Sequence, residues 1–322
     1  MSRPRLFVTR RLPEAVEARL AERYDATFQP GEDAADPPAL AAAMADHDAI
    51  LPTITDRIDA ALLGATPRRV RIIANFGAGL DHVDLDAARD AGIVVTNTPG
   101  ALTEATAELA LTLMLMTLRR AGEGERELRA GRWTGWRPTH LMGGTLSGKT
   151  LALVGFGRIA QATARRARAM GMHIRYHSRS PAAPEVEREL AATRAPSLAA
   201  LAASSDVLSL HVPGGAATHH LVDAALLAAM PVHAILINTA RGSVVDEAAL
   251  AAALAEGRIG GAGLDVYERE PAVHPGLIAS ERAVLLPHLG SATVEARTAM
   301  GIQAADNLDA FFDGREPPDR VA

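Results

Sequence analysis

The chain has 322 residues, with 33 lysines and arginines against 38 acidic residues and a formal net charge of −5. This length is about twice that of a common single domain, so two domains are expected. The weakly acidic balance provides no basic field for a nucleic-acid backbone or an anionic membrane. The absence of cysteine excludes disulfides, cysteine-ligated zinc, iron–sulfur clusters and thiol nucleophiles. No signal-peptide pattern begins the sequence and the most apolar helical run, 107–118, is too short for a bilayer, so a cytoplasmic protein is expected.

Short apolar runs alternate along the chain with alanine-rich helical stretches. This alternation predicts an α/β protein with parallel sheets and right-handed crossovers. The predicted strands form two series, 6–9, 49–51, 71–74 and 93–96, then 150–154, 173–177, 207–210, 234–238, 261–265 and 283–286. Two series of strands indicate two sheets.

A turn at Thr98-Pro99-Gly100 separates the two series and is followed by a predicted helix over 102–120. A second long helix, 292–312, follows the last predicted strand and has no further strand to serve in the second sheet. We therefore expect it to pack on the first domain, which makes that domain discontinuous. The predicted domains are 1–99 plus 290–322 for substrate binding, and 100–289 for dinucleotide binding.

The strongest local motif is Gly155-x-Gly157-x-x-Ala160, between a predicted buried strand and a predicted helix. Gly155 permits a sharp turn, Gly157 lets a pyrophosphate approach the backbone, and Ala160 allows close packing of helix on strand. The helix N-terminus then offers N–H groups to the phosphates. The motif predicts a dinucleotide site, and the alternative is an ordinary tight strand-to-helix turn.

The segment after the next predicted strand bears on the choice of cofactor. An NAD site usually places an acidic residue about 20 residues beyond the glycines, but the chain has Ser178-Arg179-Ser180 there and no acid before Glu185. A guanidinium flanked by hydroxyl groups suits a 2′-phosphate. We therefore expect NADP in preference to NAD, unless Arg179 is simply a solvated surface side chain.

Three further segments place charged residues after predicted strands, namely 238–242, 265–271 and 287–291. Reduction of a keto acid needs a cation for the carboxylate, an acid to protonate the oxygen, and a group that tunes this acid. Arg241, His288 and Glu270 suit these roles in that order. Each alone has a plainer explanation: a salt-bridged arginine, a loop histidine and an exposed acid before proline.

The histidines show no metal-binding spacing. Eleven are scattered along the chain without an HExxH motif or clustered ligands, so no metal is expected. His219 and His220 lie where a helix is expected to begin, and we expect them to cap or pack there.

The ordered set of motifs resembles the D-2-hydroxyacid dehydrogenase family, which includes glyoxylate/hydroxypyruvate reductases, phosphoglycerate dehydrogenase and formate dehydrogenase. The resemblance runs from about residue 71 to 292 and rests on 75–84, 96–100, the Gly155 loop and the three strand ends. It implies two Rossmann-like, doubly wound parallel-sheet domains with a cleft between them, the first completed by the C-terminal helix.

The same resemblance implies roles for individual residues. Arg241 would bind the substrate, His288 would be the acid/base and Glu270 its partner. The substrate-binding positions would be Leu51 and the backbone of Phe76, Gly77 and Ala78. The cofactor-binding positions would be Thr106, Gly155, Gly157, Arg158, Ile159, Ser178, Arg179, Ser180, His211, Val212, Pro213, Thr239, Ala240, Asp265, Gly290 and Ser291.

Within the family, Ser178–Ser180 is similar to the corresponding segment of NADPH-using glyoxylate/hydroxypyruvate reductases. The expected activity is reduction of glyoxylate or hydroxypyruvate to the D-2-hydroxy acid, with NADPH preferred and NAD possible. A homodimer is expected by resemblance, through residues 120–148, which include Trp133 and Trp136. Two alternatives stay open: an enzyme like D-3-phosphoglycerate dehydrogenase, although the sequence ends at Ala322 without a regulatory domain, and a non-enzymatic NAD(P)-sensing protein like the related corepressors.

Overall fold

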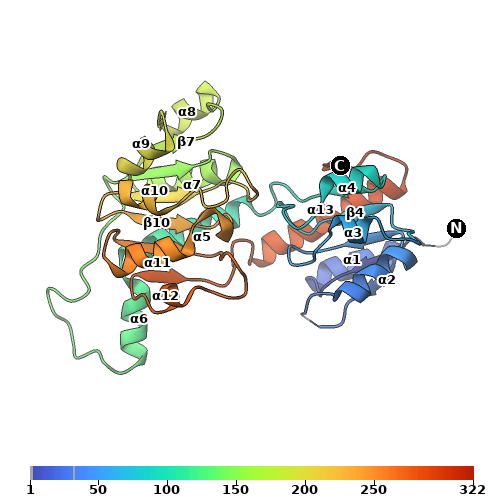
Figure 1. Cartoon of the computed structure of the whole chain (residues 1–322), viewed down its shortest axis with the longest axis horizontal. Helices are drawn as coiled ribbons and strands as arrows, with labels where there is room; N and C mark the ends of the chain where they lie inside the picture. The colour runs from blue at the N-terminus through green and yellow to red at the C-terminus, as the bar shows by residue number, and fades with distance from the viewer. Residues whose placement is uncertain (1–2, 32) are drawn as a thin grey trace. The chain divides into compact units, whose positions relative to one another are not determined.

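The computed structural model describes residues 3–31 and 33–322 of the chain. Its internal contacts divide the chain into two compact units (Figure 1). The first contains the residues up to Leu102 together with Ser291–Ala322, and the second is Thr103–Gly290. The boundaries thus lie at 102/103 and 290/291, against the predicted 99/100 and 289/290.

The first unit contains a five-stranded parallel sheet in the order β2-β1-β3-β4-β5. Its strands are β1 (Arg5–Val8), β2 (Asp25–Phe28), β3 (Ala49–Leu51), β4 (Ile72–Ala74) and β5 (Val94–Thr96). Its helices are α1 (Glu14–Arg23), α2 (Pro37–Asp46), α3 (Ala60–Leu63), α4 (Leu85–Asp90) and α13 (Val294–Phe312). Alternate residues of β1, β3, β4 and β5 enter separate apolar cores, as in a sheet covered on both faces.

The C-terminal segment completes this first unit. Helix α13 packs against α1 and β4. The end of the chain then runs antiparallel to β5, where Val321 N–H donates to Val95 O over 2.8 Å and Val95 N–H donates to Ala322 O over 3.0 Å. The edge of the sheet at β5 is therefore covered by residues from the other end of the sequence.

The second unit contains a seven-stranded parallel sheet in the order β12-β11-β10-β9-β6-β7-β8. Its strands are β6 (Thr150–Val154), β7 (His173–His177), β8 (Ala192–Arg194), β9 (Val207–Leu210), β10 (Ile235–Asn238), β11 (Gly261–Leu264) and β12 (Ala283–Leu285). Its helices are α5 (Thr103–Leu118), α6 (Ala121–Arg129), α7 (Arg158–Ala169), α8 (Pro184–Leu190), α9 (Leu198–Ala203), α10 (Ala224–Ala229), α11 (Glu247–Ala255), α12 (Pro275–Ile278) and the 3₁₀ turn η1 (Gly242–Val244). The strand order reverses between β6 and β9, and ligands of doubly wound sheets bind beside the carboxyl ends of strands at such a point.

Helix α5 is long and largely apolar and lies against the sheet, where Ala107, Ala110 and Leu113 are fully buried. It contacts β10, β11, β12 and α7. In the part of the chain that the structure describes, no helix combines the length and apolar character needed to cross a membrane.

The strand predictions are confirmed to within one residue at each end. The edge strands β2 and β8 were not predicted because each is short and partly exposed, so neither shows an apolar run. Helix α6 was also missed, since it contains two glycines and no buried residue. The expectation that a helix starts at His219 is wrong, because α10 begins at Ala224 with Asp223 as its cap.

Gly301 tests the packing of α13 on α1. A Cβ at this position would lie 2.5 Å from both Cγ atoms of the buried Val16. Helix propensity alone would make Gly301→Ala stabilising by about 1 kcal/mol. We expect the clash with Val16 to outweigh this stabilisation, so that Gly301→Ala lowers the free energy of unfolding by about 1–3 kcal/mol, measured by urea denaturation.

The matched control is Gly301→Ala combined with Val16→Ala, which removes the opposing methyl groups. The added methyl should be less destabilising in the Val16→Ala background than in the wild type. A wild-type chain stabilised by Gly301→Ala would contradict the described packing.

Candidate active site

The Gly155 turn begins directly after β6. Gly155 has φ +85°, and a Cβ there would overlap the backbone carbonyl of His211, which follows β9. Only glycine therefore fits this position. A Cβ at Gly157, by contrast, would meet no atom within 4 Å, so the space beside this residue is open. The turn thus leaves room for a ligand to approach the backbone at Gly157.

Helix α7 starts immediately after this open space. Gly157 is its cap residue and supplies no side-chain acceptor, so the N–H groups at Arg158 and Ile159 point out of the first turn. Ala160 is fully buried, which lets the helix lie close to the sheet. Exposed N–H groups and the positive end of the helix dipole fit the pyrophosphate of a dinucleotide.

The segment after β7 is held by an arginine from the neighbouring strand. Arg194 Nη2 donates to the carbonyl of Ser178 over 2.8 Å, and Ser178 Oγ donates to Ser180 O over 2.6 Å. The side chain of Arg179 is exposed and forms no hydrogen bond or ion pair with residues 3–31 or 33–322. Arg194 was missed by the sequence analysis because β8, which carries it, was not predicted.

The residues after β9 present a neutral histidine. His211 Nε2 is 2.9 Å from Ser209 Oγ, and burial lowers the pKa of His211 to about 4. The imidazole is therefore uncharged at neutral pH. With Val212 and Pro213, it forms a largely apolar segment opposite Gly155.

The turn after β10 is shaped by the buried side chain of Asn238. Its Oδ1 accepts from Ala240 N–H over 3.0 Å and its Nδ2 donates to Arg241 O over 2.9 Å. Thr239 is buried, whereas Arg241 is half-buried with Nη1 donating to Ala240 O. The next residue, Gly242, lies so close to Tyr267 that a Cβ would overlap its backbone. This contact fixes the Arg241 turn against the segment that follows β11.

That following segment carries Glu270. Glu270 Oε1 accepts from Tyr267 N–H over 2.9 Å, and Oε2 lies 2.7 Å from His288 Nδ1. Burial acts to raise the pKa of Glu270, but the hydrogen bonds from His288 and Tyr267 and the charge of Arg241 outweigh it and lower that pKa. Glu270 is therefore a carboxylate at neutral pH, in contact with the imidazole.

His288 stands in a turn organised by Asp265. Asp265 is buried; its backbone carbonyl accepts from His288 N–H over 2.9 Å, and its carboxylate accepts from Leu289 N–H over 2.6 Å and Gly290 N–H over 2.8 Å. Thr106 Oγ1 donates to Gly290 O over 3.0 Å. Burial raises the pKa of Asp265, although these backbone donors oppose the rise. The bonds hold His288 at φ +55°.

The candidate substrate residues lie in the first unit, at the ends of β3 and β4. Leu51 is fully buried, and Phe76 N–H donates to Pro52 O over 2.9 Å. Gly77 N–H donates to Asn75 O over 3.0 Å. Of the three backbone segments expected to bind the substrate, at Phe76, Gly77 and Ala78, the first two therefore have their N–H groups already engaged.

Asn75 shapes this turn and was not predicted as a site residue, although it opens the motif 75–84. Its Nδ2 donates to Gly77 O over 3.0 Å and to Gly79 O over 2.9 Å. Among the described residues, neither Ala78 N–H nor Gly79 N–H has an acceptor. These two groups remain available for an anion.

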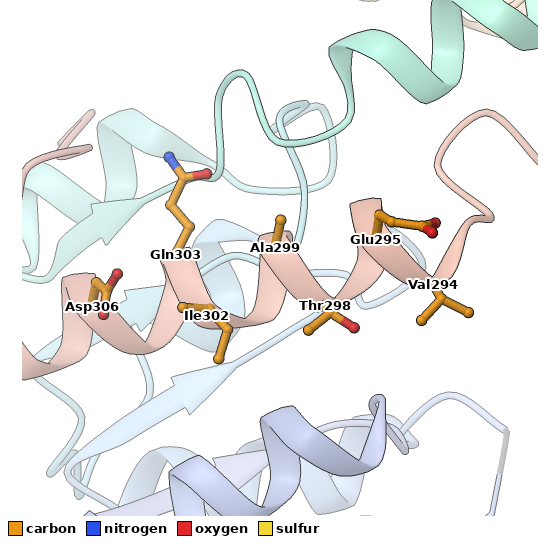
Figure 2. Close-up of a pocket in the computed structure, with 7 residues that line it drawn as sticks. All are labelled: Val294, Glu295, Thr298, Ala299, Ile302, Gln303 and Asp306. Atoms are coloured by element: carbon orange, nitrogen blue, oxygen red, sulfur yellow. The ribbon is translucent and has the colours of Figure 1, made fainter.

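The structure thus brings most of the candidates in the second unit to the carboxyl edge of its sheet, while Ser291 belongs to the first unit. A depression also runs along α13 and contains none of the candidates (Figure 2). It is lined by Val294, Glu295, Thr298, Ala299, Ile302, Gln303 and Asp306.

Comparison with known proteins gives consistent results. The family described as D-isomer specific 2-hydroxyacid dehydrogenase, NAD binding domain, matches residues 111–290. Glyoxylate reductase from Thermococcus litoralis is 43% identical over 99% of this chain and 97% of its own. The one from Aeropyrum pernix is 45% identical over 100% and 96%.

Among solved structures, an NADPH-dependent glyoxylate/hydroxypyruvate reductase from Sinorhizobium meliloti, in complex with NADP and malonate, superposes with a TM-score of 0.88. It is 41% identical, with 100% of this chain and 97% of that chain covered. The chain therefore belongs to the D-isomer specific 2-hydroxyacid dehydrogenases, oxidoreductases that act on CH–OH donors with a nicotinamide cofactor.

Proposed function

We propose that the chain reduces glyoxylate or hydroxypyruvate to the D-2-hydroxy acid with NADPH. The observation that carries this proposal is the hydrogen-bonded pair of His288 and Glu270 with Arg241 nearby, at the sheet edge that also bears the Gly155 turn. The names of the relatives from Thermococcus, Aeropyrum and Sinorhizobium support the choice of substrate.

The proposed roles follow from charge and hydrogen bonding. Arg241 binds the substrate carboxylate and polarises the carbonyl. Within the first unit, the N–H groups of Ala78 and Gly79 suit an anion. NADPH, when bound, supplies the hydride. His288 uses Nδ1 to contact Glu270, which leaves Nε2 to donate a proton to the carbonyl oxygen. The Glu270 carboxylate stabilises the protonated imidazole that this step requires.

We propose that NADPH is preferred because Arg179 offers its guanidinium to a 2′-phosphate. Its side chain is exposed and the backbone beside it is held by Arg194. A positive group fixed in this way favours a phosphate over a ribose hydroxyl. The open space at Gly157 and the first turn of α7 would hold the pyrophosphate.

We also propose a homodimer that covers α6 and the loop after it. Trp136 is 83% exposed, Met142 66% and Leu128 60% in this region, and Trp133 is also exposed. Large apolar side chains gathered on one surface segment favour burial against another protein surface. A second copy of the chain is the partner that the family resemblance suggests.

The proposed reaction is tested by initial rates of cofactor oxidation with glyoxylate and hydroxypyruvate, using NADPH and NADH in parallel. His288→Gln should lower kcat by about 10²- to 10⁴-fold, because the proton donor is lost, and should leave the NADPH dissociation constant nearly unchanged. His173→Gln, at an exposed position where β7 begins, is the matched control and should keep full activity.

Loss of both turnover and NADPH binding in His288→Gln would show that the residue is structural. Tight binding of NADPH by the wild type without turnover of any keto acid would favour the sensor alternative. Oxidation of D-3-phosphoglycerate in preference to the small acids would favour the phosphoglycerate alternative.

The pH dependence of reduction tests the role of Glu270. Because the pKa of Glu270 is lowered, its carboxylate stays charged throughout the neutral range, and the reduction rate should fall when acid pH protonates this carboxylate. Glu270→Gln places a neutral group beside His288 at every pH. The acid limb of kcat against pH that Glu270 causes should therefore be absent in this variant. Identical limbs in both proteins would refute the assigned role.

The cofactor preference is tested by Arg179→Ala. Loss of a charge-assisted hydrogen bond should lower kcat/KM for NADPH by about 10- to 100-fold and leave kcat/KM for NADH nearly unchanged. Arg188→Ala, an exposed arginine in the nearby helix α8, is the matched control. Equal losses with both cofactors, or none with either, would exclude Arg179 as the determinant.

A further inference from the structure

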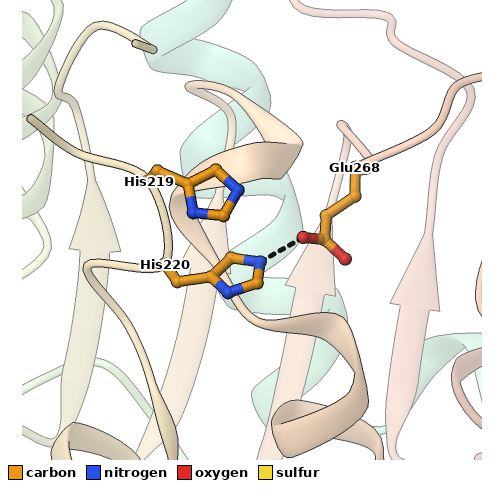
Figure 3. Close-up of side chains that lie close together, drawn as sticks. All are labelled: His219, His220 and Glu268. Carbon is orange, nitrogen blue, oxygen red and sulfur yellow. Dashed lines mark hydrogen bonds and ion pairs between the residues drawn. The ribbon is translucent and has the colours of Figure 1, made fainter. Parts of the chain in front are cut away.

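His219, His220 and Glu268 form a cluster of side chains that no step of the proposed reaction uses (Figure 3). Each offers one donor atom, and the three atoms lie within 4.8 Å of one another. His219 is exposed, whereas His220 and Glu268 are half-buried. Two imidazoles and a carboxylate are a ligand set that zinc accepts in proteins.

The backbone that carries the cluster is fixed from several directions. His220 N–H donates to Ser243 O over 2.8 Å, in a turn where His220 has φ +48°. Glu268 N–H donates to Glu247 Oε1 over 2.9 Å, and Gly242 lies directly against the Tyr267–Glu268 peptide. Two of the three candidate ligands are therefore already positioned before any ion binds, which lowers the entropy cost of binding.

The contacts among the side chains are those that a cation would replace. His220 Nε2 and Glu268 Oε1 form a hydrogen bond, so a bound metal would take the place of the proton they share. The two imidazole rings are stacked, with centroids 4.0 Å apart and planes inclined by 26°, so they present their edges side by side. Ligand atoms about 2.1 Å from zinc are roughly 3.4 Å apart in a tetrahedron, a spacing that rotation of the exposed His219 side chain would provide.

We propose that His219, His220 and Glu268 form a binding site for a zinc ion. Three protein ligands leave a fourth position for water, and the exposure of His219 gives solvent access to it. The ion would link the 213–220 segment to the segment after β11 and stabilise the second unit. This site shares no side chain with the proposed catalytic residues, and the proposal departs from the expectation from sequence that the two histidines cap or pack.

The site is tested with untagged, chelator-treated full-length protein, titrated with zinc chloride by isothermal calorimetry without substrate or cofactor. We expect one zinc ion per chain and a higher Tm in its presence. His219→Gln and Glu268→Gln should each weaken binding at least tenfold, since even partners outside the ligand shell contribute about 10- to 100-fold to metal affinity. His219→Gln alters an exposed side chain, so it remains a valid test even if Glu268→Gln does not fold.

His233→Gln is the matched control, because His233 Nε2 also contacts a carboxylate, Asp206 Oδ1 at 2.8 Å, without a second histidine in that pair. It should bind zinc as the wild type does. Zinc binding is measured without substrate or cofactor, so failure of the proposed function would not affect this test. Reductase activity of metal-free His219→Gln should equal that of the metal-free wild type. Equal zinc affinity in wild type and His219→Gln, or no binding by the wild type, would overturn the proposal.

Discussion

The position of His288 depends on the buried carboxylate of Asp265. Both of its oxygens accept backbone N–H groups, from Leu289 and Gly290, while its own carbonyl accepts from His288. A buried carboxylate without such donors would be costly, so the turn and the acid stabilise each other. The hydroxyl of Thr106 adds a further bond to Gly290 from α5. These hydrogen bonds fix the loop that carries the His288 imidazole against the sheet and α5.

Close backbone contacts, made possible by glycine, impose a second constraint. Gly242 lets the turn after β10 touch the segment after β11, and Gly155 lets the turn after β6 touch the segment after β9. In both places a Cβ would overlap the neighbouring backbone. Adjacent strand ends are therefore drawn together, which places Arg241 and Glu270 on neighbouring turns. The nucleotide motif and the catalytic candidates are thus both positioned by a glycine that packs directly against a neighbouring backbone segment.

The sequence allowed prediction of strands that show an apolar run. It did not allow prediction of features that depend on contacts with residues distant in the sequence. Central strands such as β4 and β10 are buried and mostly apolar and were found, whereas the short edge strand β8 has no such run. Because β8 was missed, Arg194, which holds the backbone beside Arg179, was missed too. The engaged N–H groups of Phe76 and Gly77 could not be predicted either, since their acceptors are set by the three-dimensional turn.

Asp265 and Glu270 show how one sheet edge gives two carboxylates different chemistry. The pKa of Asp265 is raised by burial and its oxygens are occupied by backbone donors. The pKa of Glu270 is lowered, and one of its oxygens faces the His288 imidazole. A pair of acids whose pKa values move in opposite directions divides structural from proton-handling roles. Asp265 therefore suits the holding of the loop, and Glu270 alone of the two suits partnership with His288 in the proposed proton transfer.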